Sequence, residues 1–142
     1  MEREKSATTT QRLHDRYWTR LPDGEVRLVA SECTQCHLCY LPAITTCTGC
    51  GGRSFCDKPL SGTGQLYSHT TVHNAGGIWP AEYTIAYVDY PERVRVCGHL
   101  RAPDAAMVRL DMPVGVEEAT LYVDAAGTRF NCFRFYIGED VR

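Results

Sequence analysis

The sequence predicts a mainly β protein in which a short N-terminal helix and a cysteine-rich segment precede a small Greek-key β-barrel. Two Cys-x-x-Cys motifs lie close together in the first part of the chain. After residue 59, β-branched and aromatic residues alternate with polar ones, and glycines and prolines separate the runs. We therefore expect a helical arm and lead-in strand over residues 1–30, the cysteine-rich segment over 31–58 and the barrel over 59–142.

The N-terminal arm carries two signals of a short helix. The run Thr8-Thr-Thr-Gln11 resembles a capping box, and apolar residues such as Leu13 and Tyr17 follow at four-residue intervals. These signals predict a helix over about residues 10–20. Because so short a helix needs tertiary contacts, we expect Tyr17 and Trp18 either to pack on this chain or to face a partner chain.

The two motifs, Cys33-x-x-Cys36 and Cys47-x-x-Cys50, suit a single zinc ion. Zinc(II) prefers four ligands in a tetrahedron with Zn–S distances of about 2.3 Å, and each Cys-x-x-Cys turn supplies two thiolates. Four thiolates leave no coordination position for water, so we expect a structural ion. The segment around the motifs has few large apolar side chains, and metal binding can supply roughly 10–16 kcal/mol to the folding of such a module.

The eight cysteines also allow other interpretations. A disulfide framework would suit a secreted chain, but the opening residues show no apolar stretch and no cleavage site. We therefore expect a cytoplasmic protein with reduced thiols. Within the metal site, Cys36-x-x-Cys39 is a second possible pair, and Cys56 lies shortly after the second motif. We assign Cys33 and Cys36 because Cys39 begins an extended run, and Cys39 and Cys56 remain alternative ligands.

Composition and charge exclude several classes of protein. At 142 residues the chain suits one ordinary domain or two small ones. No apolar run approaches the roughly 20 residues of a membrane span, so no membrane partner is expected. The 15 basic and 17 acidic side chains give a formal charge of −2, which provides no long-range attraction for phosphates. Nucleic acid is therefore not the expected partner.

The strands are predicted from alternation and from turn residues. We expect strands over residues 25–30, 60–72, 81–89, 93–100, 106–112, 120–124 and 128–137. The run from Pro113 to Gly115 should break the chain between two of them, and the run from Ala125 to Gly127 should turn the last hairpin. The glycines at 62 and 64 permit a bend or bulge in the first barrel strand.

Alternation also assigns side chains to faces. On the strand over 93–100, Val94, Val96 and Leu100 should point inward. Arg95 and His99 should point outward, on a face that could touch an anionic ligand but is expected to be solvated. The loop over 73–80 carries Ile78 and Trp79, apolar groups that are frequent at interface cores.

The order and spacing of these features resemble the DUF35 family, whose members join a rubredoxin-like zinc ribbon to an OB-fold. The resemblance covers about residues 12–137. It is carried by Tyr17-Trp18, the two Cys-x-x-Cys motifs with Pro42 between them and Gly51 after the second, Ser61-Gly-Thr-Gly64, and Phe133-Arg-Phe135. The sequence departs from the family pattern at His37, where glycine usually follows the second cysteine, and at Pro42-Ala-Ile44, which lacks a second proline and an arginine.

The resemblance implies an accessory subunit rather than a self-sufficient enzyme. DUF35 proteins accompany thiolase-superfamily enzymes, whose large subunit holds the catalytic Cys and His and most of the acyl-CoA. The implied reaction of the complex is thiolysis, acyl transfer or aldol-type cleavage, with the small subunit completing the assembly and shaping acyl-CoA access. The expected contacts to the partner or to acyl-CoA are Tyr17, Trp18, Ile78 and Trp79.

The residues themselves agree that catalysis by this chain is not expected. Cys97 and Cys132 lie in alternating strands and are interpreted as buried small apolar residues. His69 and His73 would share a strand face about 13 Å apart, too far to bind one metal ion. No pair of carboxylates has a spacing that predicts a general acid and base.

Two other functions fit parts of the sequence. An OB-fold beside a zinc ribbon can bind single-stranded nucleic acid through stacked aromatic side chains, and Tyr67, Tyr87, Tyr122 and Phe135 could stack in this way. A small barrel also needs aromatic residues inside, however, and the acidic balance disfavours phosphate binding. A third possibility is a free-standing module that binds acyl-CoA with no partner present.

Overall fold

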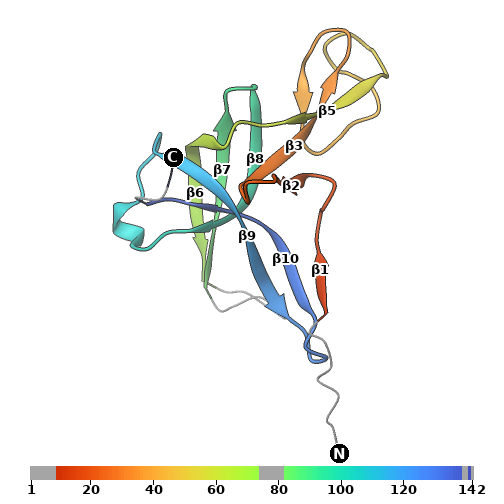
Figure 1. Ribbon diagram of the computed structural model, residues 1–142. Helices are drawn as coiled ribbons and strands as arrows, with labels where there is room; N and C mark the ends of the chain where they lie inside the picture. The colour runs from red at the N-terminus through yellow and green to blue at the C-terminus, as the bar shows by residue number, and fades with distance from the viewer. Residues whose placement is uncertain (1–8, 74–81, 139–140, 142) are drawn as a thin grey trace, which may run out of the picture.

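The computed structural model describes residues 9–73, 82–138 and 141 and is built almost wholly of strands. A small sheet near the N-terminus projects from one end of a larger, closed sheet (Figure 1). Among the described residues, no helix has the length and apolar character needed to cross a membrane.

Five of the six strands of the larger sheet form a closed barrel, and β1 (Thr10–Arg12) is added in parallel at β10. The barrel strands are β6 (Thr63–Val72), β7 (Tyr83–Tyr90), β8 (Val94–Arg101), β9 (Pro113–Val123) and β10 (Arg129–Tyr136). They pair in the order β10-β8-β7-β6-β9, and the pairing of β9 with β10 closes the ring. Neighbours are antiparallel except β8 and β10, which run parallel. This Greek-key arrangement is that of an OB-fold, so the predicted fold class is confirmed.

The barrel interior is apolar and follows the predicted alternation. Val94, Val96 and Leu100 of β8 are buried, whereas Arg95 is exposed. Gly98 lies on the same inward face, where an added Cβ would meet the ring carbons of Phe133 and Phe135 at 2.8 and 2.9 Å. The missing side chain therefore leaves room for two phenyl rings, packed edge to face at 5.7 Å.

The prediction of an N-terminal helix over about residues 10–20 is wrong. The segment instead forms β1 (Thr10–Arg12) and β2 (Trp18–Arg20), joined by a turn. Its backbone groups pair outside the segment: Leu13 N donates to Asn131 O at 2.7 Å, and Val29 N donates to Tyr17 O at 2.7 Å. His14 adopts a positive φ of 54°, which no right-handed helix allows. Long-range pairing with β10 and β3 therefore outweighs the local helix signals.

Two further strand predictions are corrected. Residues 106–112 form no strand, because a 3-10 turn (Ala105–Met107) and a turn with positive φ at Asp111 occupy this region. The backbone NH of Ala106 donates to the side chain of Asp104, which stabilises the 3-10 turn. Pro113 does not break a strand but begins β9, a position that requires no NH in the ladder.

The last hairpin and one bulge agree with expectation. Asp124 Oδ1 accepts hydrogen bonds from the NH groups of Ala126 and Thr128, and Gly127 takes a φ of 83°. The register of β6 against β7 shifts between Leu66 and Ser68, shortly after the predicted glycines. The loop that carries Ile78 and Trp79 lies outside the described residues.

One cysteine prediction is wrong and one is confirmed. Cys132 is buried in the core, but Cys97 is exposed. Cys97 belongs to the outward face of β8, together with Arg95 and His99. The alternation of β8 already implied this orientation, because residues at odd positions share one face.

Candidate metal centre

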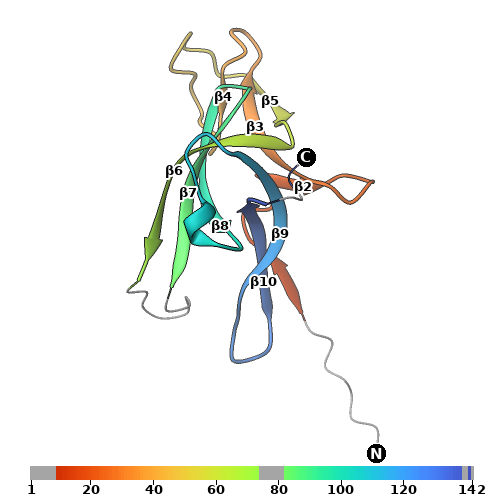
Figure 2. The same ribbon diagram turned by 90° about the vertical axis from the view of Figure 1, so that its left-hand side faces the viewer.

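The small sheet is organised around β3. Strand β3 (Val26–Cys33) pairs with β2 on one side and with β4 (Cys39–Tyr40) and β5 (Phe55–Pro59) further along. Leu28 and Ala30 of this strand lie in the core of the molecule, and its last residue, Cys33, is a predicted zinc ligand. Figure 2 shows the chain leaving the barrel along β3 and returning along β5. We call the part from residue 31 to residue 58 the ribbon.

The two Cys-x-x-Cys motifs fold into matching turns. His37 N donates to Cys33 O at 2.9 Å, and Gly51 N donates to Cys47 O at 2.8 Å. The residue after each second cysteine takes a left-handed φ, 63° at His37 and 76° at Gly51. The structure thus explains the usual glycine at this position and shows that His37 adopts the same backbone without it.

The four predicted ligand atoms meet at the end of the ribbon. The Sγ atoms of Cys33, Cys36, Cys47 and Cys50 all lie within 4.8 Å of one another. Cys33 Sγ is 3.6 Å from Cys50 Sγ, and Cys36 Sγ is 3.4 Å from Cys47 Sγ. A zinc tetrahedron with Zn–S distances of about 2.3 Å has edges of about 3.8 Å. The sulfur set therefore fits a zinc ion with only small adjustments.

A tyrosine supports the metal site from the side. The Tyr40 hydroxyl lies 3.3 Å from Cys47 Sγ and 3.0 Å from Thr48 Oγ1, and it accepts a hydrogen bond from Thr48 N at 3.2 Å. Its hydrogen bond is the largest of several, with those from the backbone of Cys50 and Gly49 and the side chain of Cys36, that lower the pKa of Cys47 to about 6 and so favour the thiolate that zinc binds. No sequence pattern predicts this role of Tyr40, since only the pairing of β4 with β3 brings its ring to the second motif.

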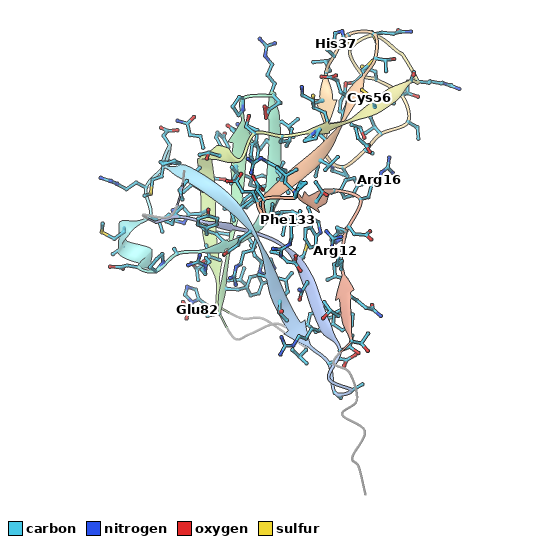
Figure 3. The ribbon with its side chains drawn as sticks, viewed as in Figure 1. Arg12, Arg16, His37, Cys56, Glu82 and Phe133 are labelled. Atoms are coloured by element: carbon cyan, nitrogen blue, oxygen red, sulfur yellow. The ribbon has the colours of Figure 1, made fainter. Side chains whose placement is uncertain are left out.

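The alternative ligands lie elsewhere. Cys39 and Cys56 flank Glu32 on neighbouring strands, with each sulfur 3.9 Å from a Glu32 carboxylate oxygen. Figure 3 labels His37 and Cys56 at the outer end of the ribbon. His37 Nδ1 is 3.8 Å from the same carboxylate. Among the described residues, the set of Cys33, Cys36, Cys47 and Cys50 is the one group of three or more possible ligands that converges on a point.

The four predicted partner contacts differ in how accessible they are. Trp18 is 1% exposed, its indole NH donates to Leu13 O at 2.7 Å, and the Arg12 guanidinium covers its ring at 4.0 Å. Trp18 therefore serves the core of this chain. Tyr17 is partly exposed beside Arg16. Ile78 and Trp79 lie outside the described residues.

The other reactive side chains do not form a catalytic group in the described part of the chain. Burial raises the pKa of the Cys132 thiol, which keeps it protonated and unreactive. His73 Nδ1 faces Glu82 at 3.6 Å, and both side chains are well exposed. His69 lies on β6 and is not part of the converging metal-ligand group.

Comparison with known proteins finds relatives in sequence and in structure. Residues 57–117 match the family model described as the C-terminal OB-fold domain of ChsH2. The chain is 29% identical over 106 residues to the benzoylsuccinyl-CoA thiolase subunit BbsA of Thauera aromatica, covering 73% of this chain and 72% of BbsA. It also superimposes on a chain of the Ltp2-ChsH2(DUF35) aldolase with a TM-score of 0.63 and 26% identity, covering 76% of this chain and 84% of that one. With a four-sulfur ribbon in front of an OB-fold, the chain is similar in sequence to BbsA and in sequence and fold to the DUF35 chain of that aldolase.

Proposed function

We propose that this protein is a non-catalytic, zinc-stabilised subunit of a thiolase-superfamily complex that acts on acyl-CoA. The observation that carries the proposal is the similarity, over about three quarters of the chain, to a subunit of an acyl-CoA thiolase and to the DUF35 chain of an aldolase. In this proposal the complex carries out thiolysis, acyl transfer or aldol-type cleavage, and the partner holds the reacting groups.

The chemistry of the metal site supports a structural role. Zinc bound at Cys33, Cys36, Cys47 and Cys50 would have a complete shell of four thiolates, with no position for water or a substrate carbonyl. Its contribution would be to hold the two motif turns together, because the ribbon buries little apolar surface of its own. A rigid ribbon could then present a fixed surface to the partner.

The partner surface is proposed from exposure and from the sequence. Tyr17 and the loop carrying Ile78 and Trp79 remain the proposed contacts, whereas the burial of Trp18 removes it from the accessible surface. In the assembled complex this chain would complete the structure and shape the entrance for acyl-CoA. Most of the acyl-CoA would be bound by the large subunit.

Co-expression with a candidate thiolase-like subunit tests the proposal. We expect the two chains to co-purify by size-exclusion chromatography and the complex to turn over an acyl-CoA that neither chain converts alone. Cys36→Ser should abolish assembly and Trp79→Ala should weaken it. Cys97→Ser is the matched control, because Cys97 is an exposed cysteine outside the metal cluster. Normal assembly of both Cys36→Ser and Trp79→Ala would refute the proposal.

Binding experiments on the isolated chain separate the other two functions. Tyr67 and Tyr87 are 50% and 46% exposed on the β6–β7 face, which is the observation that favours base stacking. Salt-dependent binding to oligonucleotides without a co-purifying thiolase would support a nucleic-acid function instead. Calorimetric binding of a CoA ester by the chain alone would support a free-standing acyl-CoA-binding module.

A further inference from the structure

A second cavity, distinct from the metal centre, lies within the barrel wall. Its volume is about 390 Å³, and all five barrel strands contribute side chains to its lining. This size is within the range of small-molecule pockets, about 300–1,000 Å³. Figure 3 labels Glu82, a lining residue, at the opposite end of the molecule from His37 and Cys56 in the ribbon. A ligand here would therefore not touch the zinc site.

The lining of this cavity is positively charged. Arg101 and Arg134 both line it, but Glu117, the carboxylate to which both bind, does not. The lining therefore holds two guanidinium groups and one carboxylate, that of Glu82, while the Glu117 carboxylate binds both arginines from outside the lining. Glu82 is the acid among the lining residues, and its side chain is 65% exposed at the rim and faces His73.

The larger cavity of the molecule has the opposite balance. Its volume is about 980 Å³, and its lining includes three arginines against four carboxylates. Arg20 there binds Glu118, and Arg101 binds Glu117, so its guanidinium groups are neutralised within the lining itself. An anion would therefore prefer the smaller cavity.

The remaining lining of the smaller cavity combines hydroxyl and apolar groups. The hydroxyls of Thr71 and Thr84 lie 3.0 Å apart and form a hydrogen-bonded pair. Leu100, Val108 and Leu121 supply apolar surface. A ligand that fits must therefore carry a charged end for the guanidinium side and a compact apolar body.

A histidine adds a neutral polar group to the wall. His99 stacks on Tyr83 with ring centroids 5.1 Å apart and an angle of 15° between the planes. Burial, together with the positive charge of Arg134, lowers the pKa of His99. The imidazole is therefore neutral at pH 7 and adds no second positive charge.

We propose that this cavity binds a small organic monocarboxylate with a compact apolar body. Arg134 would receive the carboxylate through its planar guanidinium group, the geometry that arginine offers to carboxylates. Within the lining itself the two arginines exceed the one acid, Glu82, by a single charge, which suits a monocarboxylate better than a doubly charged phosphate. The inference does not depend on the accessory role, because the isolated chain contains every residue it uses.

Benzoate is the probe for this inference, and benzamide is its neutral counterpart of the same shape. Titrating the full-length chain and following the His99 ring signals by NMR, we expect saturable shifts with benzoate and about tenfold weaker binding of benzamide. Bound benzoate should also raise the pKa of His99, because a negative charge stabilises the imidazolium. This comparison needs no variant, so it is independent of any folding defect.

Arg134→Gln should weaken benzoate binding by about tenfold. Glu117 keeps its two hydrogen bonds to Arg101 in that variant, so the fold should persist. The control is Arg95→Gln, which removes a guanidinium bound to Asp89 on the outer face and should leave binding unchanged. Equal affinity for benzoate and benzamide, unchanged binding by Arg134→Gln, tighter binding of inorganic phosphate or no saturable binding would each overturn the inference.

Discussion

The ribbon and the barrel are both β structures, yet different forces hold them together. Between residues 31 and 58 the buried residues are Ser31, Cys33, Cys47 and Gly52, none of them a large apolar residue. The barrel encloses a continuous core that includes Leu66, Val88 and Phe135. We therefore expect the ribbon to rely on a bound metal ion, while the barrel relies on apolar burial. A chain of this size could thus keep the ribbon rigid without enlarging its core.

Metal removal should produce the largest difference in stability between the ribbon and the barrel. A strong chelator should abolish hydrogen-exchange protection at amides over residues 33–56, because a structural zinc supplies roughly 10–16 kcal/mol to such a module. The barrel strands β6 to β10 should keep their protection. Exchange measured by mass spectrometry, with zinc content from elemental analysis, checks both statements.

Two results would break this contrast. If reduced, carefully purified protein contained no bound metal, a metal ion could not be what stabilises the ribbon. Loss of barrel protection together with ribbon protection would mean that β3 couples the two regions into one cooperative unit, because β3 contributes Leu28 and Ala30 to the main core and Cys33 to the sulfur cluster.

Phe135→Ala should affect the barrel and spare the ribbon. Phe135 is completely buried, and truncating such a residue costs about 3–5 kcal/mol because it removes apolar contacts and leaves a cavity. Urea unfolding followed by circular dichroism measures the loss. The matched control is Tyr87→Ala, an exposed aromatic of the same barrel, for which we expect a far smaller change.

The zinc content of the Phe135→Ala variant tests whether the metal site is independent of the barrel core. Below the unfolding transition we expect the variant to hold as much zinc as the unaltered protein, since the sulfur cluster lies in the ribbon. A parallel loss of zinc and of stability would show that the barrel core supports the metal site.

The same contrast explains what the sequence could predict. The convergence of the four cysteines follows from their spacing within a short segment, and the face of Val94, Val96 and Leu100 follows from the period of a strand. Cysteine spacing and strand periodicity are both read from residues that are close together in the sequence. The strand order, by contrast, was expected only from the resemblance to a family with an OB-fold, because no local residue pattern predicts it.

The failures occurred where distant segments decide the structure. Thr8 to Trp18 carries helix signals, but the backbone of Leu13 and Tyr17 pairs with strands far along the chain. No pattern in the neighbouring residues predicts which distant strand will pair with this segment. Tyr40 was missed for the same reason, because its hydroxyl reaches Cys47 only after β3 and β4 have paired.

Tyr40→Phe should weaken zinc binding without changing the fold. The substitution removes the hydroxyl that contacts Cys47 Sγ and orients the Thr48 backbone. Loss of such an outer hydrogen bond typically costs about tenfold or more in metal affinity. Competition with a chromogenic chelator measures the change. Tyr67→Phe on the barrel should leave the affinity unaltered, and an equal loss in both variants would contradict a specific role for Tyr40.

The smallest expected effect distinguishes the two matching turns of the ribbon. His37 and Gly51 occupy equivalent positions with φ of 63° and 76°, but only one is a glycine. His37→Gly should stabilise the zinc-bound ribbon by about 0.5 kcal/mol, because relief of the left-handed strain exceeds the added entropy of the unfolded chain. The exposed contact of His37 with Glu32, at 3.8 Å, contributes little to set against this gain.

Gly51→Ala is the matched control with the opposite sign. An added Cβ at Gly51 meets nothing within 4 Å, so its effect arises from the backbone alone and should destabilise the ribbon by about 1 kcal/mol. The chelator concentration at half release of zinc should therefore rise for His37→Gly and fall for Gly51→Ala. If His37→Gly instead lowered it, the imidazole would have to contribute more to the ribbon than its backbone strain costs, and the two turns would not be equivalent.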